Sequence, residues 1–243
     1  MTSILPANPQ AQTIQSLFNR IAPAYDQLND RLSMGQHRIW KQMAVRWSGA
    51  TTGQVCLDVC CGSGDLTRRL ARQVGRGGSV YGVDFSPALL EVARQQTAEQ
   101  VQPLAIEWVE GDALNLPFAD HGFDAATMGY GLRNVLDIPR SLQELYRVLK
   151  PGAKMAILDF HRPNSAWIRT FQQWYLNLVV VPAAESLGLK QEYAYISPSL
   201  DRFPTGQEQI VLAQSAGFVN VTHYPIAAGM MGVLVAQKPG YLI

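Results

Sequence analysis

The apolar residues of this chain fall into short runs, separated by stretches in which they recur at helical spacing. Five of the runs have the length and composition of β-strands, and they cover residues 55–59, 80–84, 105–109, 123–128 and 155–159. Between them, the stretches 87–93 and 137–150 keep their apolar residues on one helical face. Strands that alternate with helices predict a doubly wound α/β sheet that is mostly parallel.

Two more apolar runs close the chain, at 219–224 and 230–237, after a helix that we expect within 203–217. The short connection between these two runs predicts an antiparallel pair at one edge of the sheet. The expected fold is therefore an α/β fold with a doubly wound, mostly parallel, seven-stranded sheet.

Two regions lie outside this alternation. Residues 1–12 are polar and contain prolines, which predicts a loose segment, whereas 13–47 shows apolar residues at helical spacing. The stretch 166–189 is rich in Trp, Tyr, Leu and Val. We therefore expect one domain over 1–243, with an N-terminal helical cap over 1–50 and an apolar lid or insertion over 165–204.

Composition narrows the possible partners. The chain has 243 residues and a formal net charge of +1, without a long basic run, which argues against a nucleic-acid surface. It has neither the pattern of a signal peptide nor a run of about 20 apolar residues that could span a membrane. We expect a cytoplasmic protein, and the sequence leaves open contact with a membrane surface and association between copies.

The three cysteines are clustered at Cys56, Cys60 and Cys61, which is not the spacing of a secreted disulfide framework. Adjacent Cys60 and Cys61 would suit a redox pair or half of a metal site. No second Cys/His cluster accompanies them, so we favour small residues that fill a strand end, and we expect no metal.

The stretch 55–67 carries the clearest chemical signal in the chain. It runs from a strand into a glycine turn and then into a helix, with Gly62 and Gly64 on either side of Ser63. Glycines at these places let the backbone bend tightly and let a ligand approach it closely. The next strand ends at Asp84, about 20 residues further on, where a carboxylate meets ribose hydroxyls in nucleotide-binding folds. The pattern predicts a nucleoside cofactor.

The charges around the turn favour one nucleoside over another. A dinucleotide site needs a third glycine where this chain has Thr67, and the turn has no basic residue for a diphosphate. Asp58 and Asp65 would repel a diphosphate and suit a cationic ligand. We therefore expect S-adenosylmethionine, which carries an ammonium and a sulfonium, rather than NAD, and count Asp58 among the cofactor-binding residues.

Four blocks of sequence together resemble the class I S-adenosylmethionine methyltransferases and, among them, the ubiquinone/menaquinone biosynthesis C-methyltransferases. The blocks are Phe-Asn-Arg-Ile-Ala-Pro-Ala-Tyr-Asp at 18–26 with Leu-Asn-Asp at 28–30, Met-Gly-Gln-His-Arg-Ile-Trp-Lys at 34–41, the glycine turn at 58–67, and Gly-Tyr-Gly-Leu-Arg-Asn at 129–134. The glycine block is common to all such methyltransferases, whereas the other three are far more specific to quinone methylation.

The resemblance implies a role for each matching residue. For the cofactor it implies these contacts: the methionine end with Gly62, Ser63 and Gly64, the ribose with Asp84, the adenine edge with Asp112 and Ala113, and the reacting methyl group with Gly129. It also implies that Tyr25 and Asp26 lie over the cofactor. Arg133 and Asn134 are expected at the quinol.

The residues taken alone leave simpler explanations open. Asp112 lies in a Gly-Asp-Ala turn that it could cap. An arginine after a strand usually forms an ion pair, which for Arg133 would be with Asp137, and Asn134 could cap the turn that follows.

Three residues outside the glycine turn also need an explanation. His161 follows the strand 155–159 and is either a general base or a solvated loop histidine. His37 and Trp40 are expected to serve helix packing or capping rather than catalysis.

The implied chemistry constrains the substrate. Methylation of a ring carbon needs a carbon nucleophile, and a quinone is electrophilic, so the substrate must be the reduced hydroquinone. Loss of a phenolic proton moves charge onto the ring carbon beside the prenyl chain. Since a phenol has a pKa of about 10, a guanidinium beside its hydroxyl would favour the anion. We assign that role to Arg133, with Asn134 orienting it.

Two segments, 195–206 and 228–239, differ from the commoner menaquinone pattern and are closer to the phylloquinone branch of the family. The expected substrate is therefore a phytylated demethylnaphthoquinol. Alternatives are a demethylmenaquinol, a ubiquinone precursor, another small acceptor such as a sterol or phenol, and a non-catalytic scaffold of a quinone-synthesis complex. The aromatic stretch 167–181 could line a tunnel for the tail, rest on a bilayer, pack in the core or form a dimer face.

Overall fold

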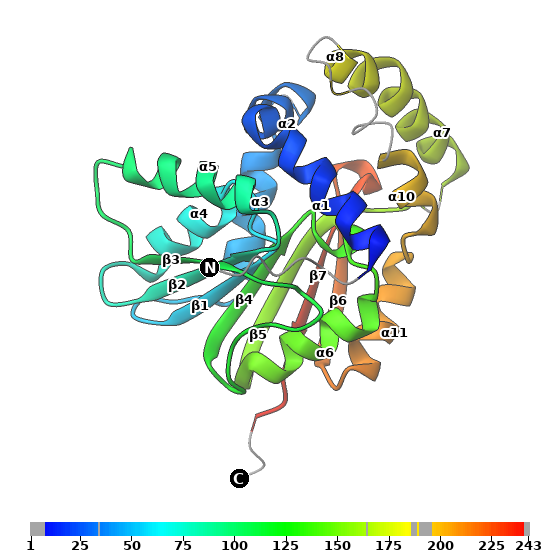
Figure 1. Cartoon of the computed structure of the whole chain (residues 1–243). Helices are drawn as coiled ribbons and strands as arrows, with labels where there is room; N and C mark the ends of the chain where they lie inside the picture. Colours follow the sequence, from blue (N-terminus) through cyan, green and yellow to red (C-terminus); the bar gives the residue numbers. More distant parts are fainter. Residues whose placement is uncertain (1–7, 34, 164, 186–188, 190–195, 241–243) are drawn as a thin grey trace.

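The computed structural model describes residues 8–33, 35–163, 165–185, 189 and 196–240. Its centre is one seven-stranded sheet in the order β3-β2-β1-β4-β5-β7-β6, in which β7 runs in the direction opposite to the other six strands (Figure 1). The strands are β1 (Val55–Val59), β2 (Ser79–Asp84), β3 (Ile106–Glu110), β4 (Phe123–Gly129), β5 (Leu149–Phe160), β6 (Val219–Ile226) and β7 (Met231–Gln237). The predicted α/β class, the seven strands and the antiparallel edge are confirmed.

Helices cover both faces of the sheet (Figure 1). The helices of the sheet layers are α3 (His37–Trp47), α4 (Asp65–Val74), α5 (Pro87–Ala98), α6 (Ile138–Val148) and α11 (Gly206–Ser215). Helices α4 and α5 connect parallel strands by right-handed crossovers and so lie on the same face, next to α3, whereas α6 and α11 lie on the other. The order of strands reverses between β1 and β4, where folds of this kind bind their ligands.

Alternation along β1 supplies both halves of the core. Cys56 packs with Leu70 and Val80 on the α4 face, while Leu57 packs with Met128 on the α6 face. All of these side chains are buried, as expected for a central parallel strand whose two faces are both covered. Strand β1 is therefore a rigid base for the glycine turn that follows it.

The helical cap begins earlier than the sequence pattern predicts. Helix α1 covers Pro9–Ile21, so the expectation that 1–12 is loose is wrong for residues 9–12, while 1–7 lie outside the described residues. The cause is local, because the Asn8 side chain accepts a hydrogen bond from the Gln10 N–H (2.8 Å) and a proline follows at the first helical position. After α1 come a short 3-10 turn, η1 (Ala22–Ala24), and α2 (Tyr25–Ser33).

The helix predicted over 137–150 also ends early, at Val148, because β5 begins at Leu149 and continues through Pro151 and Gly152. Proline cannot donate the hydrogen bond that an α-helix would need there, and Gly152 has a φ of 83°. A 3-10 turn, η2 (Leu132–Asn134), precedes α6.

The insertion after β5 is helical. It contains α7 (Ala166–Tyr175), a π-helical turn η3 (Leu176–Val180), α8 (Val181–Glu185) and α10 (Ile196–Arg202). Leu176 and Val180 are buried against the N-terminal helices, in one cluster with Ile21. The cap and the insertion thus meet at one end of the sheet, at the top of Figure 1. No helix among the described residues is long and apolar enough to cross a membrane.

Candidate active site

A cavity of about 530 Å³ opens at the carboxyl ends of β1 to β4, beneath α1. Its wall includes residues that directly follow these strands and apolar residues of the N-terminal helix. The predicted residues that line it are Tyr25, Gly62, Asp84, Asp112, Ala113, Gly129 and Asn134. Sequence reasoning missed Phe18, Phe85, Glu110 and Tyr130, which also line it.

The glycine turn has the backbone that its sequence predicts. Gly62 and Gly64 have φ angles of 56° and 82°, in the left-handed region that glycine adopts without strain. Gly62 lies under Tyr25, since a Cβ added at this glycine would be 3.7 Å from the ring. Gly64 is the N-cap residue of α4, and its missing side chain leaves room for Trp108. The turn therefore leaves its backbone open to the cavity while α2 covers it.

Asp84 ends β2 at the floor of the large cavity. One of its carboxylate oxygens accepts the Gly62 N–H at 2.8 Å, and the other accepts the Ser86 N–H at 2.9 Å. Burial raises the pKa of Asp84 to about 6, although these backbone hydrogen bonds oppose the rise. The same carboxylate thus shapes the glycine turn and keeps lone pairs for a ligand.

The charge of the cavity wall selects its ligand. Four acidic residues line the large cavity, Asp84, Glu110, Asp112 and Asp137, and no Lys, Arg or His is among the described residues that do so. Such a wall repels a diphosphate and attracts a cation. The cavity therefore favours a cationic cofactor, as the sequence predicted. The carboxylates responsible are not Asp58 and Asp65, from which that prediction was made.

Asp58 and Asp65 do not line the large cavity. Asp58 is completely buried, and its carboxylate accepts hydrogen bonds from the hydroxyls of Thr67 (2.6 Å) and Thr127 (2.8 Å). Burial raises its pKa to about 7, and the two hydroxyls oppose this. Thr67, which replaces the third glycine of a dinucleotide site, is thus a tie between β1 and α4.

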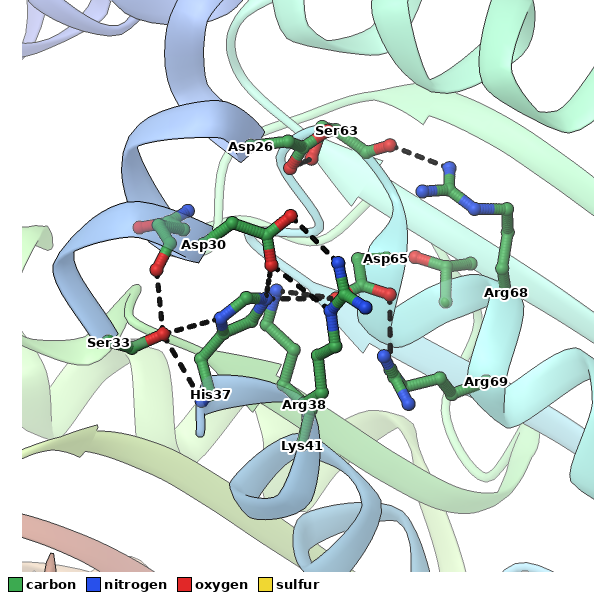
Figure 2. A network of polar contacts seen from close by, with 12 residues as sticks. Asp26, Asp30, Ser33, His37, Arg38, Lys41, Ser63, Asp65, Arg68 and Arg69 are labelled. Atoms are coloured by element: carbon green, nitrogen blue, oxygen red, sulfur yellow. Dashed lines mark hydrogen bonds and ion pairs between the residues drawn. The ribbon is translucent and has the colours of Figure 1, made fainter. Parts of the chain in front are cut away.

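Ser63 also serves the turn rather than the cavity wall. Its hydroxyl donates to the Asp26 carboxylate at 2.6 Å, and its carbonyl accepts from Arg68 at 2.8 Å (Figure 2). The other Asp26 oxygen accepts from the Gln96 amide at 2.7 Å. This chain of hydrogen bonds fixes the start of α2 over the glycine turn; of the pair expected over the cofactor, Tyr25 lines the cavity and Asp26 does not.

A second polar network joins α2, α3 and α4 (Figure 2). Lys41, with a side chain only 6% exposed, donates to Asp65 at 2.9 Å, and Arg69 donates to the other oxygen at 3.0 Å. Burial would raise the pKa of Asp65, but Lys41 and Arg69 outweigh it and lower this pKa to about 2. Asp65 is therefore a structural anchor for the helices that cover the site.

Asp112 and Ala113 follow β3 at the cavity edge. Asp112 caps its own turn by accepting the Leu114 N–H at 2.9 Å, as one of the two explanations of this residue predicted, and it also lines the large cavity.

Cys60 lines the large cavity as well. Its backbone lies in the left-handed region, at a φ of 54°, and burial raises the pKa of its thiol. A Cβ at Gly131 would lie 2.5 Å from that of Cys60, so only glycine fits there.

A smaller cavity of about 160 Å³ adjoins the first, between the N-terminal helices and the insertion. Four residues line both cavities: Phe18, Tyr25, Tyr130 and Asn134. Burial raises the pKa of Tyr25 to about 12, against the opposing effect of Arg133, and it also raises the pKa of Tyr130. Both phenols are therefore protonated at the boundary between the cavities.

Arg133 lines only the smaller cavity. The predicted ion pair with Asp137 is wrong, because Arg133 Nη1 donates to Asp159 at 2.6 Å and to the Tyr130 carbonyl at 3.0 Å. Asp137 instead caps α6 by accepting the Arg140 N–H. The Arg133 Nε is buried and has no hydrogen-bond partner within the described part of the chain. The guanidinium is thus anchored on one side and has an unused donor.

Asn134 donates from Nδ2 to the Tyr130 carbonyl at 2.9 Å, four residues earlier, so it holds the loop after β4 rather than the turn that follows it. His161 is not a solvated loop histidine. It is buried with its ring 4.7 Å from that of His223, and it lines neither cavity.

Sequence reasoning missed four polar residues of the smaller cavity. Asn29, Ser33 and Gln172 line it, and His37, expected only to pack or cap, lines it as well. The Asn29 side chain is within hydrogen-bonding reach of the Tyr25 hydroxyl, an interaction that opposes the rise in the pKa of Tyr25. A sequence signal existed for the first two, since Asn29 and Ser33 follow Tyr25 at intervals of four and so share one face of α2, whereas His37 begins the next helix.

Comparisons with known proteins agree with this geometry. Residues 7–238 match the model of the ubiE/COQ5 methyltransferase family. The chain is 70% identical to the 2-phytyl-1,4-naphtoquinone methyltransferase of Nostoc punctiforme, over 93% of this chain and 98% of that protein. It is 56% identical to the protein of that name from Synechocystis, over 98% and 100%. A chloroplastic 2-phytyl-1,4-beta-naphthoquinone methyltransferase of Arabidopsis thaliana is 53% identical, over 91% and 86%.

Solved structures show the same fold at low sequence identity. An S-adenosylmethionine-dependent methyltransferase from Aquifex aeolicus has a TM-score of 0.60 at 18% identity, over 81% of this chain and 88% of its own. A methyltransferase from Thermotoga maritima has a TM-score of 0.62 at 20% identity, over 93% and 99%.

The Asp65 network makes a prediction about stability. Because the folded pKa of Asp65, about 2, lies below the value of about 3.9 in an unfolded chain, its contribution is complete above pH 4 and is lost as the pH falls toward 2. Asp65→Asn should lower the free energy of unfolding by about 2 kcal/mol at pH 7 and flatten the dependence between pH 4 and 2. Urea unfolding between pH 2 and pH 8 measures both effects.

The control is Asp120→Asn, which breaks an ion pair of Arg147 with a carboxylate that is 62% exposed. A solvated pair contributes little, so this variant should unfold like the wild type. An equal loss in the two variants would contradict the anchoring role of Asp65.

Proposed function

The chain belongs to the ubiE/COQ5 methyltransferase family, and we propose that it transfers a methyl group from S-adenosylmethionine to a ring carbon of a phytylated demethylnaphthoquinol, a step of phylloquinone biosynthesis. The ring and tail follow the names of relatives that match this chain over nearly its whole length. The reaction class follows from the family.

The observation that carries this proposal is the junction of two unlike cavities. The larger one is acidic and lies at the strand ends, and the smaller one is mostly apolar and contains Arg133. Tyr25, Tyr130 and Asn134 line both of them. Methyl transfer needs two bound reactants in line and shielded from water, and two adjoining cavities provide this arrangement.

The large cavity fits S-adenosylmethionine. We assign the ribose to Asp84, the adenine edge to Asp112 and Ala113, and the methionine end to the backbone at Gly62 and Gly64. Gly129, at the end of β4, would lie beside the reacting methyl group. The four carboxylates of the wall complement the positive charges of this ligand.

Two of the residues predicted to bind the cofactor, Ser63 and Asp58, do not line the large cavity. Ser63 and Asp58 would support the cofactor indirectly, Ser63 by binding Asp26 and Asp58 by tying β1 to α4 and β4. Both hold the glycine turn that binds the methionine end.

The smaller cavity suits the quinol. When bound, S-adenosylmethionine supplies an electrophilic methyl group, and the substrate must supply a nucleophilic ring carbon. Arg133 would stabilise the phenolate beside that carbon, because its guanidinium is held in place by Asp159 and its buried Nε–H has no partner among the residues that the structure describes. Asn134 would fix the loop that carries Arg133 through its bond to the Tyr130 carbonyl.

The cap (1–50) and the insertion (165–204) would close the site as a lid over the tail. Apolar residues from both regions line the smaller cavity: Leu17, Phe18, Ile21, Trp40, Tyr175, Leu176 and Val180. These regions belong to the same domain as the sheet, because they share buried clusters with residues of β5 and β7.

The opposite side of the insertion would rest on a membrane surface. Trp167, Phe171, Trp174 and Leu178 lie along α7 and η3 and are 77%, 42%, 52% and 60% exposed. The stretch 161–184 contains Arg162 and Arg169 and no carboxylate, so an anionic bilayer complements it. A cytoplasmic protein that meets the membrane at this helix would take up its phytylated substrate where that substrate dissolves.

Two substitutions test the proposed roles of the two cavities separately. Arg133→Ala should reduce the turnover number about a thousandfold, since a donor to the developing charge is lost, while the Kd of S-adenosylmethionine stays nearly unchanged. Asp84→Asn should raise that Kd about tenfold or more, because a charged hydrogen-bond acceptor is lost. Calorimetric titration gives the Kd, and mass-spectrometric turnover gives the rate.

Arg94→Ala is the matched control, because Arg94 is half-exposed on α5, pairs with the exposed Glu91 at 3.7 Å, and lines neither cavity. It should leave both the Kd and the turnover number unchanged. A large loss of cofactor affinity in Arg133→Ala would reject the assignment of Arg133 to the quinol.

The membrane contact is tested with Trp167→Ser/Trp174→Ser. Loss of two exposed indoles should reduce binding to vesicles of phosphatidylglycerol about tenfold, with little change in turnover of a short-tailed demethylnaphthoquinol. Cosedimentation measures the bound fraction. Val101→Ser/Val211→Ser, on exposed residues of other elements, should bind like the wild type. Unchanged vesicle binding, or a shift in the sedimentation coefficient that marks a lost dimer, would contradict a membrane role for α7.

A further inference from the structure

Four residues of the N-terminal cap line the smaller cavity at intervals of four: Tyr25, Asn29, Ser33 and His37. The first three lie on α2, and His37 begins α3. The methylation assigned above requires a group that removes a proton from the quinol, and Arg133, as a cation, cannot accept one. The cap provides polar side chains at the same cavity.

Ser33 and His37 are in direct contact. The Ser33 Oγ lies 2.7 Å from His37 Nδ1, donates its proton to the Asn29 carbonyl at 2.7 Å, and accepts the His37 backbone N–H at 3.4 Å (Figure 2). When the hydroxyl rotates from the Asn29 carbonyl to donate to His37 Nδ1, one lone pair still accepts the His37 N–H and the other can accept a proton from a ligand in the cavity.

Two carboxylates determine which imidazole nitrogen is protonated. The Nε2 atom of His37 is 3.6 Å from Asp30 and 3.9 Å from Asp65. Negative oxygens on this side favour the proton on Nε2, so that Nδ1 keeps its lone pair and accepts from Ser33. The serine, imidazole and carboxylates thus form a chain from the cavity into the polar network beneath it.

We propose that His37 is the general base of the reaction and takes the quinol proton through the hydroxyl of Ser33. The inference rests on the function proposed above and names the proton acceptor of that same site. Asn29 lines the same cavity, and its carbonyl holds the Ser33 hydroxyl at 2.7 Å.

The step balances as follows. The O–H bond of the quinol beside the accepting carbon breaks, its proton goes to Ser33 Oγ, and the proton of Ser33 goes to His37 Nδ1. The electron pair left on oxygen delocalises onto the ring carbon, which bonds to the methyl group as the carbon–sulfur bond breaks. Loss of the proton from that ring carbon restores aromaticity, and one of the two protons returns to the oxygen. The net products are the methylated quinol, S-adenosylhomocysteine and one proton.

The other titratable groups at this cavity cannot take that role. Among the described residues that line it, these are Tyr25 and Tyr130, whose pKa values burial raises, together with Tyr175 and Arg133. Burial and Lys41 lower the pKa of His37 below 6.5, although Asp65 and Asp30 oppose them and Arg38 adds to the lowering. The imidazole is therefore neutral at pH 7. Once protonated, it faces Asp30 from α2, Arg38 and Lys41 from α3, and Asp65 from α4.

The test is the pH dependence of single turnover with bound S-adenosylmethionine and reduced demethyl-phytylnaphthoquinone. The wild-type rate should rise with pH, level off above an inflection below pH 6.5, and stay flat through pH 8. His37→Gln should lose this inflection, react about a hundredfold more slowly at pH 7, and gain rate steadily toward high pH, where the quinol ionises unaided. Ser33→Ala, which keeps the imidazole but breaks the relay, should lose the same inflection.

Folding and cofactor binding are checked separately, because His37 lies in the network of Figure 2. Both variants should keep the wild-type Kd for S-adenosylmethionine, and His121→Asn, at the opposite end of the sheet, should keep the full pH profile. A His37→Gln or Ser33→Ala protein that retains the wild-type inflection, or that loses rate equally at every pH, would overturn the proposal. A wild type without turnover of this acceptor would instead reject the proposed function, so the two failures are distinct.

Discussion

The position of helix α2 over the glycine turn is the constraint on which the rest of the site depends. At the start of α2, Asp26 accepts the hydroxyl of Ser63, and near its end Asp30 binds Arg38 of α3, so that α2 is fixed at both ends. This placement brings Tyr25 against Gly62 and makes the same ring part of both cavities. If α2 shifted, the two cavities would no longer meet at a shared wall, and two bound reactants would lose the alignment that methyl transfer requires.

Charge is divided between the cavities in a way that suits the reaction. Four carboxylates of the large cavity attract a sulfonium ligand, while the smaller cavity has a buried guanidinium beside apolar walls. A phenolate is favoured next to Arg133 and the cation is favoured next to the acids, and the two attract each other across Tyr25 and Tyr130. The glycine turn and Asp84 are intact, and they place the charges for catalysis, which argues against a scaffold without activity.

Sequence patterns predicted the fold class and the glycine turn, because the alternation of strands and helices and the turn glycines follow from local periodicity and backbone geometry. Side-chain partners across the sheet were less accessible. Arg133 was paired with nearby Asp137, but its partner Asp159 ends the adjacent strand β5, 26 residues away. Asp58 and Asp65 were predicted to favour a cationic ligand from their charge alone. Their carboxylates instead accept hydrogen bonds from Thr67 and Thr127 and from Lys41. His37 was assigned to packing because its contact with Ser33 spans two helices.

The account centres on a reduced acceptor that meets the methyl donor between the two cavities. The most direct measurement is mass-spectrometric turnover with S-adenosylmethionine and demethyl-phytylnaphthoquinone, with and without a quinone reductant. One methyl group added to the ring only under reducing conditions is the predicted result, because only the quinol has a nucleophilic carbon. Equal methylation of the oxidised quinone, or no product in either redox state although the cofactor binds, would contradict the account.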